Sequence, residues 1–236
     1  MTWMFELYRS HVFKKFVMAV TGLILFGFVL GHMAGNLKLY LGKYETGEHA
    51  GEYQIDVYAE ALRELGSPIL PHGHGLWIAR IALLLAVGLH IWSATELTLV
   101  NYRARPTSYV RETHQKSTYA SRTMRWGGVL IALFVVYHLL HFTVGAPDVH
   151  PDFRPGEVFH NVVVGFENPL VSGFYILANL ALGLHLYHGL WSFTQSLGLS
   201  GPRWNSLRHK IAAAFAVLIS AGNISFPLAV LTGLVQ

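Results

Sequence analysis

The chain has 236 residues, of which 53% are hydrophobic and only 13% are charged. Soluble globular domains carry about 25% charged residues, so this composition excludes an ordinary soluble domain. The sequence contains no cysteine, which excludes disulfides, cysteine-ligated iron–sulfur clusters, covalent c-type haem attachment and thiolate nucleophiles.

Five apolar runs divide the chain, and each is close to the roughly 20 residues that a helix needs to cross the hydrocarbon core. The runs are Phe16–Leu37, Leu76–Leu99, Gly127–Val144, Leu170–Gln195 and Ile211–Val235. The sequence therefore predicts an all-α integral membrane protein. We expect a five-transmembrane-helix bundle that forms one domain over residues 1–236.

The connection between the first two runs is too long to be a plain loop. Its middle, Glu52–Leu65, has the spacing of a short amphipathic helix. The apolar side of that helix is predicted to carry Tyr53, Val57, Leu62 and Leu65. Glu60 lies on the same segment, near the outer surface. It is a candidate for proton exchange with a quinone, and the alternative is an ordinary solvated or headgroup-facing charge.

The Lys and Arg residues gather in alternate connections, which marks the cytoplasmic side. They occur before the first run, between the second and third runs (residues 101–125), and after the fourth run. The other two connections are acidic. This pattern predicts a cytoplasmic N-terminus and an external C-terminus. It also explains the formal net charge of +4 without nucleic-acid binding. The basic loop 101–125 is the natural docking surface for a cytoplasmic partner.

Histidines at membrane depth carry the chemistry. Ionisable side chains are rare inside a bilayer and usually functional. A single histidine could simply hydrogen-bond a neighbouring helix, but here each of the first four runs contains at least one. The six are His32, His90, His138, His141, His185 and His188. The fifth run contains none.

The depth of these histidines sorts them into two pairs. A helix rises about 1.5 Å per residue, which puts His32 and His138 in the outer half and His90 and His185 in the inner half. Two imidazoles from different helices at one level suit both axial positions of a haem iron. We therefore expect two b-type haems, held between the first four helices. His141 and His188 follow a ligand candidate by three residues, so the choice of ligand within each doublet stays open.

Residues around the histidines suggest further contacts. Gly27, Gly31 and Gly35 form a stripe at four-residue spacing, which favours ordinary helix packing over contact with a flat macrocycle. Arg122 and Arg125 begin the third run on the inner side. These cations are candidates for binding the haem propionates.

Several motifs then resemble a known family. They are SHVFKKFVMAVTG at residues 10–22, GHMAGNL around His32, GLHIW around His90, SRTMRWGG leading to YHLLHF, and GLHLYHGLWSF around His185. In order and spacing they resemble the membrane cytochrome b subunit of succinate dehydrogenase and fumarate reductase. The similar class has one polypeptide, five helices and two haems.

The resemblance implies His32, His90, His138 and His185 as the haem ligands, with the first paired to the third and the second to the fourth. It further implies a bacterial inner-membrane complex with a flavoprotein subunit and an iron–sulfur subunit on the cytoplasmic side. The chain would pass electrons between the iron–sulfur subunit and a quinone, typically menaquinone. It would not act on succinate by itself.

Three other functions compete with this one. A histidine-lined metal transporter would also need acidic residues at membrane depth, where only Glu96 lies. A membrane di-iron oxidase or desaturase would need HxxxH or HxxHH clusters, which the sequence lacks. The cytochrome b of another quinone-linked enzyme, such as a hydrogenase or formate dehydrogenase, would share the chemistry. Only the motif resemblance separates that last alternative.

Overall fold

The computed structural model describes residues 10–104, 119–199 and 201–236, with residues 119–122 described by their backbone alone. Within these residues, five helices are long and apolar enough to cross a membrane. They are α2 (His11–Asn36), α4 (His74–Arg103), α5 (Tyr119–Leu139), α7 (Pro169–Ser196) and α8 (Asn205–Leu231). The predicted five-helix, all-α membrane fold is confirmed.

Two of the long helices, α2 and α7, begin at a polar side chain that caps the helix. Ser10 Oγ accepts a hydrogen bond from the Phe13 N–H at 3.1 Å, so α2 begins at His11 rather than at Phe16. Asn168 Oδ1 accepts from the Leu170 N–H at 2.9 Å and opens α7, with proline in its first turn.

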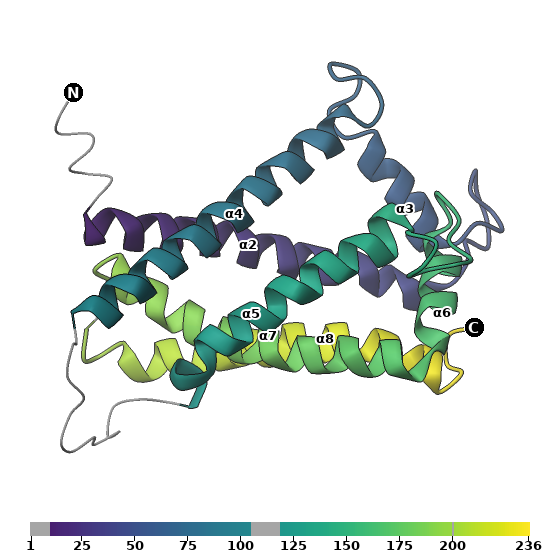
Figure 1. Cartoon of the computed structure of the whole chain (residues 1–236). Coiled ribbons are helices and arrows are strands. Elements are labelled where there is room, and N and C mark those ends of the chain that lie inside the picture. Colours follow the sequence, from purple (N-terminus) through teal and green to yellow (C-terminus); the bar gives the residue numbers. More distant parts are fainter. Residues whose placement is uncertain (1–9, 105–118, 200) are drawn as a thin grey trace.

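The helices pack as neighbouring pairs, with α2 along α4, α5 along α7, and α7 along α8 (Figure 1). Helix α4 crosses α2 at one end of the bundle and diverges from it toward the other. A buried cluster joins α2, α7 and α8, and its members are Met33, Leu186, Ala216 and Ile219. Helix α8 has no histidine at membrane depth, so its part is to support α7, which carries two.

Short helices cover the end of the bundle at which α8 finishes (Figure 1). They are the 3₁₀ segment η1 (Leu37–Leu41), α3 (Gln54–Arg63) and α6 (Val158–Glu167). Their apolar side chains join α7 and α8 in a second cluster that includes Leu39, Ile55, Phe159, Phe166, Tyr175 and Phe226. The sequence analysis did not predict α6, because its ten residues are too short to cross a membrane.

Helix α3 lies within the predicted amphipathic segment, but its buried side differs from the prediction. Ile55 is 3% exposed and was not assigned to that side, whereas Leu65 follows the helix and is 51% exposed. The reason is that α3 packs against η1 and α6. The Tyr53 ring stacks on Phe159 of α6 with ring centres 3.6 Å apart.

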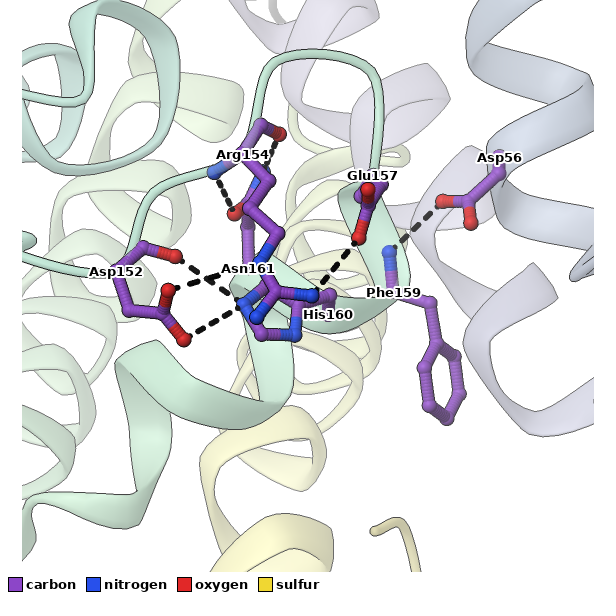
Figure 2. Close-up of polar contacts among 7 residues, drawn as sticks. All are labelled: Asp56, Asp152, Arg154, Glu157, Phe159, His160 and Asn161. Atoms are coloured by element: carbon purple, nitrogen blue, oxygen red, sulfur yellow. Dashed lines mark hydrogen bonds and ion pairs between the residues drawn. The ribbon is translucent and has the colours of Figure 1, made fainter.

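A network of polar contacts shapes the turn before α6 and ties it to α3 (Figure 2). Asn161 Oδ1 accepts from the Arg154 N–H at 2.8 Å, and its amide donates to the Arg154 carbonyl at 2.7 Å. Across the helices, Asp56 of α3 accepts from the Phe159 N–H at 2.8 Å. Asp56 thus satisfies one of the free N–H groups at the start of α6.

Burial raises the pKa of Asp56 above its usual range, and the Phe159 hydrogen bond offsets only part of that effect. Because the folded protein favours the protonated form of Asp56, this group stabilises the fold at pH values below the ordinary aspartate pKa of about 3.9. The stabilisation is lost as the pH rises through the pKa that Asp56 has in the folded protein. We expect Asp56→Asn, which keeps an acceptor oxygen, to remove this pH dependence and to stabilise the protein at pH 7. Thermal unfolding of the detergent-purified protein between pH 4 and pH 7 measures it.

The exposed Asp148 supplies the control, because Asp148→Asn should leave the pH profile unchanged. A lower unfolding temperature for Asp56→Asn at pH 7, with the original pH profile, would contradict the assignment.

Candidate functional site

Two histidines from α2 and α5 face each other in the half of the bundle nearer to α3 and α6, which the sequence predicts to be the outer half. The ring centres of His32 and His138 are 5.8 Å apart, and the ring planes are inclined at 77°. The Phe28 ring lies 5.4 Å from His32, and the Phe134 ring lies 5.8 Å from His138. The structure therefore brings together the two residues that the depth argument paired, within aromatic surroundings.

A second pair of histidines, from α4 and α7, lies in the other half, which the sequence predicts to be the inner one. The His90 and His185 ring centres are 6.2 Å apart, and their planes are inclined at 62°. A metal held by two imidazoles would place the ring centres about 6 Å apart, because each metal–nitrogen bond is about 2 Å long and the ring centre lies beyond the nitrogen. Both pairs have this spacing.

The distance between the two pairs can be measured along two helices. His90 packs against Gly22 of α2, and His32 lies ten residues further along that helix. His138 contacts Tyr175 of α7, and His185 lies ten residues further along that one. At about 1.5 Å per residue, both routes put the pairs at levels about 15 Å apart.

The hydrogen bonds of the paired histidines form at the Nδ1 side. His90 Nδ1 lies 3.2 Å from Thr21 Oγ1, and His138 Nδ1 lies 3.3 Å from the Tyr175 hydroxyl oxygen. His185 Nδ1 is buried without a partner. The contact of His138 with Tyr175 leaves Nε2 as its nitrogen available to a metal. His90 also hydrogen-bonds the Met18 backbone, so ligation of His90 and His185 through Nε2 stays a prediction.

His32 follows the same pattern, with Asn36 one turn further along α2. The Asn36 amide nitrogen lies 3.1 Å from His32 Nδ1. Metal ligation at His32 Nε2 requires the proton on Nδ1. Asn36 Oδ1 then accepts a hydrogen bond from this N–H, which requires the Asn36 amide to be rotated so that its oxygen and nitrogen exchange places.

The structure separates the members of each histidine doublet. His141 is 1% exposed, and its Nδ1 lies 2.9 Å from the Tyr175 hydroxyl oxygen. The His188 ring lies 5.1 Å from the Trp191 ring. In the described part of the chain, neither of these rings contacts a histidine of α2 or α4. By position, His138 and His185 are the candidates for ligands, and their ligand role stays a prediction.

The glycine stripe of α2 does not pack against a helix along its length. A β-carbon at Gly35 would collide with Tyr58 of α3, but at Gly27 and Gly31 it would meet no atom within 4 Å. The expectation of helix packing is therefore wrong at those two positions. Gly22, outside the predicted stripe, is the glycine in contact with a paired histidine: a β-carbon there would lie 3.3 Å from His90 Cε1.

The cations near the inner end bind partners within the chain. Arg125 donates to the Tyr102 hydroxyl at 2.6 Å and lies over that ring. Lys14 pairs with Glu96 at 2.7 Å, which explains the one acidic residue predicted at membrane depth. The Arg122 side chain lies outside the described residues. Propionate binding by Arg122 and Arg125 stays a prediction.

Glu60 is 58% exposed on the side chain and belongs to a surface cluster. It pairs with Arg63 at 2.9 Å and lies 3.7 Å from His72, which in turn contacts Glu64 at 2.6 Å. Ligand atoms of Glu60, Glu64 and His72 lie within 4.8 Å of one another, outside the spans. Over the described ranges, no such three-ligand group lies within a span.

Sequence reasoning missed Thr21, Asn36 and Tyr175, the polar partners of the paired histidines. The four-residue spacing of Asn36 from His32 was a usable signal, because such residues share a helix face. Thr21 and Tyr175 lie on other helices than the histidines they contact. No sequence signal relates them to those histidines.

One family profile, described as the succinate dehydrogenase/fumarate reductase transmembrane subunit, matches residues 101–222, just over half of the chain. The matched region contains His138 and His185, whereas His32 and His90 precede it. No curated protein and no solved structure matches the chain. Five membrane-spanning helices agree with a membrane subunit. The chain therefore belongs to the family of succinate dehydrogenase and fumarate reductase transmembrane subunits.

Proposed function

We propose that this protein is the two-haem membrane anchor of a succinate:quinone oxidoreductase. In this proposal His32 and His138 hold the outer haem iron, and His90 and His185 hold the inner one. The observation that carries it is the presence of two histidine pairs, with ring centres 5.8 Å and 6.2 Å apart, at two levels of the bundle. The family, whose members usually bind haem, supports the same cofactor.

The chain's own residues hold and shield the cofactor. In this proposal Nε2 of each paired histidine would hold the haem iron. Nδ1 of His90 and of His138 would then donate hydrogen bonds to Thr21 Oγ1 and to the Tyr175 hydroxyl, which orient the two rings. Haem held in this way would supply one-electron transfer. Phe28 and Phe134, beside the outer pair, exclude water from it.

Electrons would pass through the chain in two steps. A cytoplasmic iron–sulfur subunit, joined to a flavoprotein subunit, would exchange electrons with the inner pair, and the outer pair would exchange them with a quinone, most simply menaquinone. The lack of cysteine leaves the clusters to the partner. The setting is a bacterial inner membrane, with the N-terminus in the cytoplasm. Glu60 is left out of this path, because its surface ion pairs account for it.

The purified complex should contain two low-spin haems per chain. We expect His90→Ala or His185→Ala to remove only the inner haem, and His32→Ala or His138→Ala only the outer one, because an axial ligand has no substitute at its level. His141→Ala and His188→Ala, which alter neighbours of the ligands, should retain both haems. A pyridine haemochromogen assay with reduced spectra of each variant is the test. One haem per chain in the unaltered protein, or equal loss from His138→Ala and His141→Ala, would refute the assignment.

Gly22 should be required for the inner haem. Gly22→Val adds a branched side chain where a β-carbon alone would lie 3.3 Å from His90 Cε1, so the imidazole must move. We expect inner-haem occupancy to fall by about tenfold or more while the outer haem is retained. The matched control is Gly27→Val on the same helix, where a β-carbon meets no atom within 4 Å. Similar haem loss from both variants would show that the effect is not local to His90.

A further inference from the structure

A buried hydroxyl joins the two histidines of the α5 doublet. The Tyr175 oxygen lies 3.3 Å from His138 Nδ1 and 2.9 Å from His141 Nδ1. Tyr175 is 4% exposed and His141 is 1% exposed, so bulk water does not compete for these bonds. A buried polar group that loses its partner costs about 1–3 kcal/mol. The three side chains therefore depend on one another for hydrogen bonding.

The number of protons decides which group donates. A tyrosine hydroxyl has one proton to donate and lone pairs that accept. If His138 binds iron through Nε2, its ring proton is on Nδ1 and is donated to the Tyr175 oxygen. The Tyr175 hydroxyl can then donate its own hydrogen bond to His141 Nδ1, which accepts it. In this arrangement His138 Nδ1, the Tyr175 hydroxyl and His141 Nδ1 all have partners. The reverse arrangement would leave His138 Nε2 protonated and unable to bind iron.

The backbone of α5 changes where this junction forms. The helix gives way to a π-helical segment, η2 (Leu140–Val144), which contains His141. Such wider turns are frequent at functional sites. The His141 carbonyl accepts from His150 Nδ1 at 3.1 Å, and the His150 ring lies 4.8 Å from the His141 ring. His141 is thus held from both sides with Nδ1 toward Tyr175.

In the inner pair a hydroxyl also lies at Nδ1 of one histidine, and there it belongs to Thr21. Thr21 Oγ1 donates its one proton to the Val17 carbonyl at 2.7 Å, so toward His90 Nδ1 it can only accept. The proton of His90 is therefore on Nδ1, and Nε2 keeps its lone pair. In both pairs a hydroxyl whose own proton is engaged elsewhere selects the ring proton position that metal binding requires.

We infer that Tyr175 is a positioning residue for the outer haem ligand and that His141 is the acceptor that keeps Tyr175 in this role. The inference rests on the proposed function. By accepting the Nδ1 proton of His138, Tyr175 increases the electron density on the liganding nitrogen, which favours ferric over ferrous iron and lowers the midpoint potential of the outer haem.

The test is Tyr175→Phe in the complete complex, because this change removes only the hydroxyl and keeps the ring among its aromatic neighbours. We expect two haems, an outer haem with an altered low-spin electron paramagnetic resonance signal, and a raised outer midpoint potential. The expected change is about tenfold in the oxidised-to-reduced ratio, or about 59 mV for one electron. The inner haem should be unchanged.

Substitutions of His141 provide a second test, which can still be carried out if Tyr175→Phe does not retain the outer haem. His141→Leu removes the acceptor and should shift the outer potential in the same direction, whereas His141→Asn places an amide oxygen near the former Nδ1 and should restore it. In the Tyr175→Phe background, His141→Leu should add nothing, because the two act through one hydroxyl.

Two controls locate the effect. Tyr137→Phe removes a hydroxyl next to His138 that forms no described hydrogen bond, and it should shift neither haem. Thr21→Val should shift the inner haem alone. An unchanged outer signal and potential in Tyr175→Phe, or equal shifts of both haems, would overturn the inference. That outcome would leave the haem assignment intact, because the haem assignment is tested separately by the haem content of the unaltered protein and of the histidine variants.

Discussion

The fold depends on the way imidazole nitrogens are satisfied inside a bilayer. An unpaired polar atom in hydrocarbon is costly, so each intramembrane histidine needs partners within the protein. His90 and His138 each meet a hydroxyl at Nδ1, and in each pair the ring lies about 6 Å from the ring of a facing histidine. This requirement fixes which helices must be neighbours at each level. Helix α8, which has no histidine at this depth, stabilises α7 by apolar packing.

The end of the bundle at which α8 finishes is better covered by protein than a simple helix bundle would be (Figure 1). Helices α3 and α6 and the segment η1 bury an aromatic cluster that reaches Tyr175, and Asp56 links α3 to α6. The same cluster therefore contributes to the fold and keeps water from the Tyr175 junction. Hydrogen bonds are stronger where the dielectric is low. Because the aromatic cluster keeps water away, the position of the Tyr175 hydroxyl has a larger effect on His138 beside it.

The five spans could be predicted from the sequence, and so could the positions of His32 facing His138 and of His90 facing His185. Run length predicts the spans, and helical rise predicts the level of each histidine. The sequence could not predict α6, whose ten residues resemble an ordinary loop, or the contacts of Thr21 and Tyr175, which depend on the facing helix. The glycine stripe misled for a related reason: spacing identifies a face of α2 but not what lies opposite it.

The most direct test of the central claim is a cryo-electron microscopy map of the assembled complex at a resolution that shows side chains. Two haem densities should appear, one with its iron between Nε2 of His32 and His138, and one with its iron between Nε2 of His90 and His185, about 15 Å apart along the helices. A map in which either histidine pair is in direct contact, with no metal between the rings, would contradict the account.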